Sequence, residues 1–151
     1  MRLPYKLGDV FAFPLRGEGG FCVGVIAGMP EDGKVLLGYF YEKIYAHIPS
    51  KTEVADLKPH DALRIWRFGD LSLVNKEWPI VGRIAAFNLT EWPSPKFFRE
   101  SMLQLITYAN SDPLRKTQVE PYLDNGERYE RDDIYGAGAV EIAMTNIVNS
   151  G

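Results

Sequence analysis

The sequence predicts an α+β fold: a strongly bent antiparallel β-sheet, or a small barrel-like β core, with a C-terminal helix packed on it. Short β-branched and aromatic runs separated by glycine and proline turns predict the β core. Val140, Ala143, Met144 and Ile147 recur at helical spacing and predict the helix. The chain has 151 residues, 46% of them hydrophobic, so we expect residues 1–151 to form a single domain.

Three strands are expected near the N-terminus, at residues 10–15, 21–27 and 35–41. The turns between them are glycine-rich, at residues 16–20 and 30–33, and glycine readily adopts the positive φ that tight turns require. The third strand is apolar almost throughout, which indicates burial on both faces or a strong bend. The pattern is typical of a small, curved meander.

The polar segment 49–59 is bounded by prolines and contains Ser50 and Glu53, which have the spacing of a capping box. A short helix is therefore expected there. Residues 63–68 then alternate between apolar and basic, which predicts a strand with Arg64 and Arg67 near solvent.

Two further strands are expected at residues 71–74 and 80–87, followed by a packed loop at 90–98, where two prolines remove backbone donors. Residues 99–109 fit either a helix or a strand, and the β-branched and aromatic residues at the end of this run favour the strand. Residues 122–131 form a charged connection.

The C-terminal helix is expected to begin near Ala137, because Gly136 and Gly138 are poor helix formers. Asp132 or Asp133 can cap it.

Composition excludes several classes of protein. The formal net charge is −3, without the basic excess that a nucleic-acid binder carries. Cys22 is the only cysteine, so no intramolecular disulfide can form and a reducing compartment fits best. The N-terminus lacks the apolar core of a signal peptide, and no apolar run is long enough to span a membrane. We therefore expect a cytoplasmic protein without a nucleic-acid or membrane partner.

The charge is unevenly distributed along the chain. Residues 1–119 carry a formal charge of +2, whereas residues 120–151 carry −5. This acidic stretch is either a solvated connection that favours the start of the helix, or a negative field that steers a cationic partner. Both readings remain open. Six of its seven acidic residues precede the expected helix, and we call residues 120–133 the acidic stretch: Glu120, Asp124, Glu127, Glu130, Asp132 and Asp133.

Residues capable of catalysis are few. His47 and His60 have no metal-ligand spacing with each other or with a cysteine, and Cys22 lies within an apolar strand, where a cysteine is usually a small buried hydrophobe. No catalytic residue, cofactor site or metal site is predicted. Trp78 and Trp92 each precede a proline and either fix a loop to the core or serve as exposed binding anchors, with packing favoured.

Several segments together resemble the immunity protein 26 family of bacterial polymorphic toxin systems. They are Tyr5-Lys6-Leu7-Gly8-Asp9-Val10-Phe11-Ala12-Phe13-Pro14-Leu15, Phe21-Cys22-Val23-Gly24-Val25, Phe68-Gly69-Asp70-Leu71, Trp78-Pro79-Ile80-Val81-Gly82 and Gly136-Ala137-Gly138-Ala139-Val140-Glu141. The resemblance implies a non-enzymatic cytoplasmic inhibitor that binds a cognate toxin domain, frequently a nuclease, and blocks it. We expect no cofactor, and the sequence makes no prediction of the oligomeric state.

We hypothesise that the acidic stretch forms part of the toxin interface, through Asp124, Glu127, Glu130 and Asp133, with Trp78 or Trp92 as an anchor. A second reading is a small-barrel endoribonuclease or RNA-binding protein, in which Arg16, Arg64 and Arg67 bind phosphates. A third is a barrel that binds a small molecule or peptide in a groove containing Trp66 and Trp78.

Overall fold

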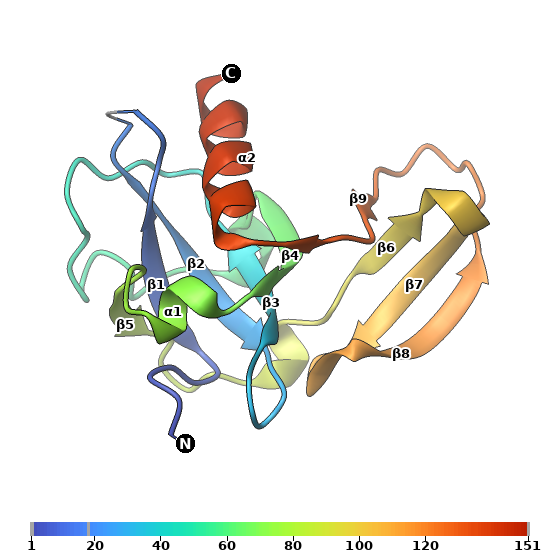
Figure 1. Ribbon diagram of the computed structural model, residues 1–151, viewed down its shortest axis with the longest axis horizontal. Helices are drawn as coiled ribbons and strands as arrows, with labels where there is room; N and C mark the ends of the chain where they lie inside the picture. The colour runs from blue at the N-terminus through green and yellow to red at the C-terminus, as the bar shows by residue number, and fades with distance from the viewer. Residues whose placement is uncertain (1, 18, 151) are drawn as a thin grey trace.

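The structure is a computed structural model that describes residues 2–17 and 19–150; Glu18, in the predicted turn at 16–20, lies outside the described residues. The described residues form ten strands in two sheets, together with two α-helices. Figure 1 shows the C-terminal helix beside the larger sheet, and the smaller sheet to one side of the larger one. The predicted α+β fold with a C-terminal helix is confirmed, and the sheets are open rather than closed into a barrel.

The larger sheet has the strand order β10-β4-β3-β2-β1-β5. Strands β1 to β4 pair with their sequence neighbours in antiparallel fashion, which confirms the predicted meander. Gly17, Gly20 and Gly33 have positive φ in the two turns between β1 and β3, the conformation for which glycine was expected. The strands are β1 Asp9–Pro14, β2 Phe21–Gly28, β3 Val35–Phe40, β4 Arg64–Gly69, β5 Ile80–Arg83 and β10 Ile134–Tyr135.

The smaller sheet has the strand order β8-β7-β6-β9. Strand β7 lies within the ambiguous segment 99–109, so the favoured strand prediction is confirmed for most of it. Strand β6 replaces the end of the predicted loop at 90–98, and β8 falls where no element was predicted. The strands are β6 Lys96–Arg99, β7 Gln104–Ala109, β8 Asp112–Pro121 and β9 Glu130–Arg131.

The helices correct two predictions. Residues 71–74 form the helix α1 rather than a strand, because the carbonyl of Asp70 accepts hydrogen bonds from the amides of Leu73 and Val74. Gly136, and not Asp132 or Asp133, occupies the N-cap of α2, because β10 separates those aspartates from the helix. The α-helices are α1 Leu71–Val74 and α2 Ala137–Asn149, and the 3-10 helices are Pro59–Asp61, Leu89–Glu91 and Glu100–Met102.

Two other segments also differ from prediction. Ser50 and Glu53 exchange the two hydrogen bonds of a capping box, at 3.0 and 3.4 Å, but turns rather than a helix follow. Val54 alone among residues 50–56 is buried, so a helix there would have no apolar stripe to cover. Strand β5 ends at Arg83, short of the predicted 87, and Ala86 has a φ of 52°, which is incompatible with a continuing strand.

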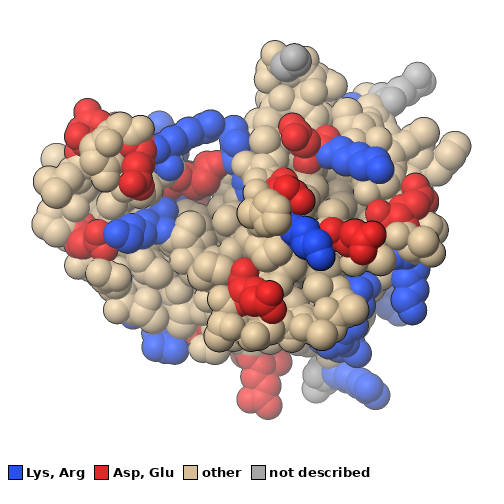
Figure 2. Space-filling model, turned by 180° about the vertical axis from the view of Figure 1, so that it is seen from behind, with Lys and Arg blue, Asp and Glu red and all other residues tan. Residues whose placement is uncertain are grey.

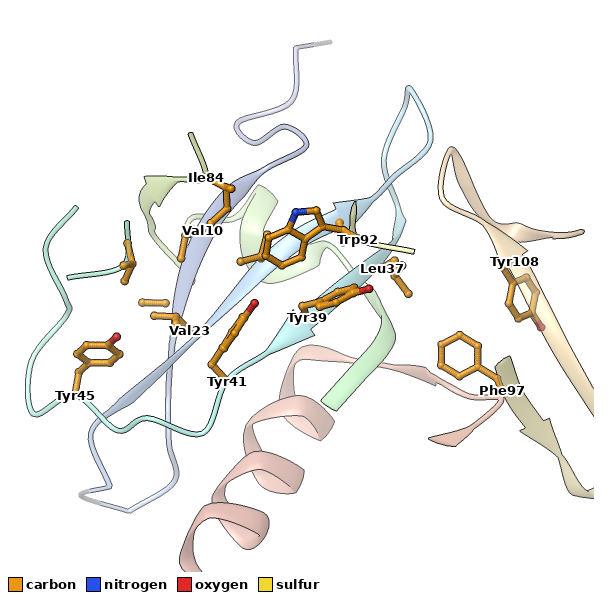
Figure 3. Packing of buried hydrophobic residues seen from close by; sticks show 14 of the residues in the cluster. Val10, Val23, Leu37, Tyr39, Tyr41, Tyr45, Ile84, Trp92, Phe97 and Tyr108 are labelled. Atoms are coloured by element: carbon orange, nitrogen blue, oxygen red, sulfur yellow. The ribbon is translucent and has the colours of Figure 1, made fainter. Parts of the chain in front are cut away.

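The larger sheet is covered on both faces. On one face, Val10, Val23 and Tyr39 form a core with Phe97 and Tyr108 of the smaller sheet (Figure 3). On the other face, an aromatic cluster packs against α2, where Val140 and Met144 are fully buried. This two-sided burial explains why β1 to β3 are apolar along nearly their whole length. The aromatic cluster contains Phe11, Phe13, Phe40, Trp66, Phe68 and Trp78.

Candidate functional site

Arg67 lies buried between the two sheets, so the prediction that it lies near solvent is wrong. Arg67 is only 4% exposed, because the smaller sheet covers this face of β4. The guanidinium lies 3.9 Å from the centre of the Tyr108 ring and donates a hydrogen bond to the Pro113 carbonyl at 3.1 Å. It also donates to Asp132 Oδ1 at 2.7 Å. Arg64 is likewise mostly covered, with 17% of its side chain exposed.

The Asp132 carboxylate is the centre of this buried network, with 1% of its side chain exposed. Besides the bond from Arg67, it accepts hydrogen bonds from Arg99 Nη2 at 2.6 Å and from the Tyr108 hydroxyl at 2.7 Å. The hydrogen bond to Asp132 raises the pKa of Arg99, and burial together with the bond to Asp132 raises the pKa of Tyr108. Four charged or polar side chains thereby share one hydrogen-bond network. Within it, Arg67 Nε is buried and has no hydrogen-bond partner among the described residues.

The network fixes a segment that belongs to both sheets. Strand β9 pairs in parallel with β6 of the smaller sheet, and β10 pairs in parallel with β4 of the larger one. Asp132 lies between β9 and β10, and its partners come from β4, β6 and β7. Because one carboxylate contacts three strands of two sheets, it holds the sheets in a fixed relative position.

Two more residues of the acidic stretch form ion pairs with basic residues of the same chain. Glu130 accepts from Arg64 Nε at 2.9 Å, and Glu120 pairs with Lys96 at 2.8 Å across the smaller sheet. The latter hydrogen bond raises the pKa of Lys96. Together with Asp132, half of the six acidic residues therefore have internal partners, and the structure removes Glu130 from the freely accessible charges.

The three remaining acidic residues are exposed: Asp124, Glu127 and Asp133. Asp124 and Glu127 lie in the connection 122–129 between β8 and β9, which we call the acidic loop. Glu127 is held in place, since its amide donates to Asn125 Oδ1 at 3.0 Å and its carboxylate accepts from the Tyr129 hydroxyl at 3.0 Å. Figure 2 shows acidic and basic side chains interspersed over the face opposite to that of Figure 1.

The acidic loop borders a groove between the two sheets. A cavity of about 440 Å³ is lined by residues 127–130, by residues 62–65, and by Pro95 and Lys96. Glu127 and Glu130 are thus brought to one groove, whereas Asp133 lies outside its lining. The structure does not bring the four predicted interface acids into one cluster.

Trp78 and Trp92 are core residues, so the prediction that either is an exposed anchor is wrong. They are 1% and 3% exposed. Trp78 stacks on Phe11 at 5.5 Å, and its Nε1 donates to Glu141 of α2 at 2.9 Å. Trp92 packs edge-on against Tyr39. The favoured alternative, that these indoles fix loops to the core, is confirmed.

The arginines proposed for RNA phosphates are engaged elsewhere. Arg16 pairs with Glu141 at 3.1 Å, Arg64 with Glu130 and Arg67 with Asp132. Each positive charge faces a carboxylate of the protein itself, which disfavours phosphate binding at these positions.

The other candidate groups have structural surroundings. Cys22 is buried, and burial raises the pKa of its thiol to about 12, so the nucleophilic thiolate is scarce. His47 and His60 are exposed. Within residues 2–17 and 19–150, no three His, Cys, Asp or Glu side chains are grouped as a metal site requires. Neither α-helix in this part of the chain is long and apolar enough to cross a membrane.

One surface feature has no counterpart in the sequence predictions. Met102, Leu103 and Leu123 are 59%, 62% and 71% exposed, at one end of the smaller sheet, and we call them the apolar tip. Their sequence spacing carries no signal, because Met102 and Leu103 continue into the apolar run of β7 and Leu123 lies within a charged connection. Only the fold places them at the surface together.

The chain matches a known protein family. The sequence pattern of a family described as Immunity protein 26 matches residues 6–108, which extend from before β1 almost to the end of β7. The acidic stretch, α2 and the resembling segment 136–141 follow the matched residues. No curated protein and no protein of known structure matches at a significant level. Since the match covers more than half of its residues, the chain belongs to the immunity protein 26 family.

Proposed function

We propose that this protein binds and neutralises a cognate secreted bacterial toxin, acting in the cytoplasm with residues 1–151 as a single immunity domain. The family match over residues 6–108 carries this proposal, because an immunity protein has a toxin as its protein partner and is in general not an enzyme. The shared core between the two sheets and the Asp132 network support one folded unit.

The toxin we propose is a nuclease, and the protein inhibits it by covering the active or substrate-binding surface. A nuclease holds an anionic backbone with lysine and arginine side chains. Asp124, Glu127 and Asp133 are exposed carboxylates that complement such a surface. The internal pairing of Arg16, Arg64 and Arg67 weighs against the alternative that this chain itself binds RNA.

The direct test begins with the reading frame beside this gene, where we expect a toxin domain to be encoded. We expect this toxin to arrest growth when expressed alone and growth to resume when this protein is co-expressed. The purified pair should elute as one complex, and the protein should inhibit cleavage of RNA or DNA by the toxin.

Two results would contradict the proposal. One is a folded protein that neither binds the neighbouring toxin nor restores growth. The other is ribonuclease activity of this protein alone that is lost in Arg64→Ala, which would favour the RNA alternative.

A further inference from the structure

We infer that the apolar tip, with the acidic side chains beside it, is the principal contact with the toxin. This inference rests on the proposed function and adds to it the place of contact and the character of the partner surface. The three apolar residues come from two connections that the fold brings together.

Hydrogen bonding defines the geometry of the tip. Met102 and Leu103 lie in the connection between β6 and β7, and Leu123 is the second residue of the acidic loop after β8. The Tyr122 amide donates to the Leu103 carbonyl at 2.9 Å, which places Leu123 one residue from this contact. Figure 1 shows the β6–β7 connection at the same end of the sheet as the end of β8.

The grouping of three exposed apolar residues, rather than exposure alone, distinguishes the tip from a single surface residue such as Leu71. Single exposed apolar residues are common on soluble proteins, but neighbouring ones rimmed by polar groups mark interaction sites. More than half of each of these three side chains is open to solvent. Bound against a partner, they would form the dry centre of an interface.

Aromatic contacts and a buried leucine fix the connections that carry the apolar tip. The ring centres of Phe98 and Tyr122 lie 4.5 Å apart, and Tyr122 also packs edge-on against Tyr129 at the other end of the acidic loop. Leu105, on the strand that follows the tip, is only 4% exposed. A patch fixed in this way loses little conformational freedom on binding.

Leu103 adds an independent observation. Its φ is 50° and its ψ is 52°, in the left-handed region that glycine and asparagine adopt more readily than leucine. A leucine held there and left 62% exposed gains little from burial within this chain. Contact with a partner would bury it and account for a large apolar side chain at a strained position.

The charges around the tip define the occupant. Asp124 is exposed next to Leu123, and Glu100, with 72% of its side chain exposed, makes a 3.8 Å contact with Arg131. We therefore commit to a toxin surface with an apolar centre flanked by lysine or arginine. Met102 and Leu103 lie within the family match and Leu123 and Asp124 beyond it, so the second pair is where we place partner selectivity.

The test compares Leu103→Asn and Leu123→Asn with two controls, by titration against the toxin domain encoded beside this gene. Asparagine is polar, close to leucine in size and tolerant of positive φ. Leu71→Asn is the exposure-matched control, since Leu71 is 66% exposed next to the larger sheet. Lys76→Asn is the backbone-matched control, with a φ of 62°.

We expect the Kd of each tip variant to rise at least about tenfold, as for a hot-spot residue, while both controls bind like the wild type. We also expect Leu103→Asn to melt no lower than the wild type, because asparagine relieves the backbone strain. A purely structural role for Leu103 would lower both stability and affinity in that variant, and would leave the affinity of Leu123→Asn unchanged.

The outcomes separate the two proposals. If the wild type binds and both folded tip variants bind equally well, the tip is not the contact and the proposed function stands. If the wild type itself does not bind the neighbouring toxin, the proposed function fails and the tip assignment fails with it.

Discussion

Asp132 shows how far a single side chain can be interpreted from sequence. Its position before an amphipathic segment predicts a helix cap, because aspartate is a good N-cap residue. In the folded protein its carboxylate instead accepts hydrogen bonds from Arg67, Arg99 and Tyr108. These partners are 24 to 65 positions away in the sequence, so no local pattern could indicate them.

We expect Asp132→Ala to lower the free energy of unfolding by about 3–5 kcal/mol, because it leaves the charge of Arg67 buried without its partner. Urea denaturation of the purified proteins measures this change. Asp133→Ala is the matched control, since this neighbouring aspartate is exposed, and we expect it to stay within about 0.5 kcal/mol of the wild type. Equal effects of the two substitutions would mean that the buried network does not stabilise the fold.

Asp9 is expected to make stability depend on pH. Burial raises the pKa of its carboxyl, against the opposing effects of the Lys6 amide and of nearby cations. The folded state then holds the proton more tightly than the unfolded state, so this residue's contribution to stability falls as pH rises through the folded pKa. In the wild type, the Lys6 amide donates to Asp9 Oδ2 at 2.9 Å. Asp9→Asn removes the charge and keeps a side-chain oxygen that can accept this hydrogen bond.

We therefore expect Asp9→Asn to be at least as stable as the wild type at neutral pH, with its relative advantage shrinking towards about pH 4. Thermal melting of both proteins across this range gives the difference. If Asp9→Asn instead melts below the wild type by the same amount at every pH, burial does not destabilise the charged form of Asp9 in the folded protein.

At the scale of elements, burial decides which strands the sequence reveals. Strands β1 to β4 are covered by other layers, and their β-branched and aromatic runs predict them directly. Strand β8 lies at the edge of the smaller sheet and is almost entirely exposed. Its basic residues and terminal prolines are typical of a protected edge, which lacks the apolar alternation that identifies a strand.

One apolar stripe in the sequence predicts helix α2, and we expect that stripe to account for the stability of the helix. Met144 is fully buried against the larger sheet, whereas Ile142 of the same helix is 49% exposed. We expect Met144→Ala to destabilise the protein by about 2–5 kcal/mol and Ile142→Ala by much less. Denaturant midpoints measure both changes, and similar losses would mean that α2 is not anchored through this stripe.

At the scale of the whole molecule, the sequence predicts the separation of charge but not its neutralisation. The acidic stretch is evident from counting alone, with −5 in residues 120–151. Folding pairs Glu120, Glu130 and Asp132 with basic residues from β4 and β6. Those pairs join strands distant in the sequence, so only the tertiary structure separates the internal charges from the three that a partner can meet.

This separation predicts which charges contribute to toxin binding. We expect the combined change Asp124→Asn, Glu127→Gln and Asp133→Asn to weaken binding about tenfold at low salt, chiefly through slower association. Glu130 is left intact because its loss would leave Arg64 without a partner. The remaining affinity should vary less with salt, because long-range attraction between exposed charges is what salt screens.

The matched control is Glu31→Gln, Asp32→Asn and Asp56→Asn, which removes three exposed carboxylates elsewhere on the molecule. Both triple variants change the net charge by the same amount, so they differ only in where the charge is removed. Association rates at several salt concentrations distinguish the two. If the control slows association as much as the variant of Asp124, Glu127 and Asp133 does, the attraction arises from the net charge of the whole protein and not from a directed acidic surface. A slower rate confined to the first variant would instead locate the approach of the toxin near the acidic loop, where the apolar tip lies.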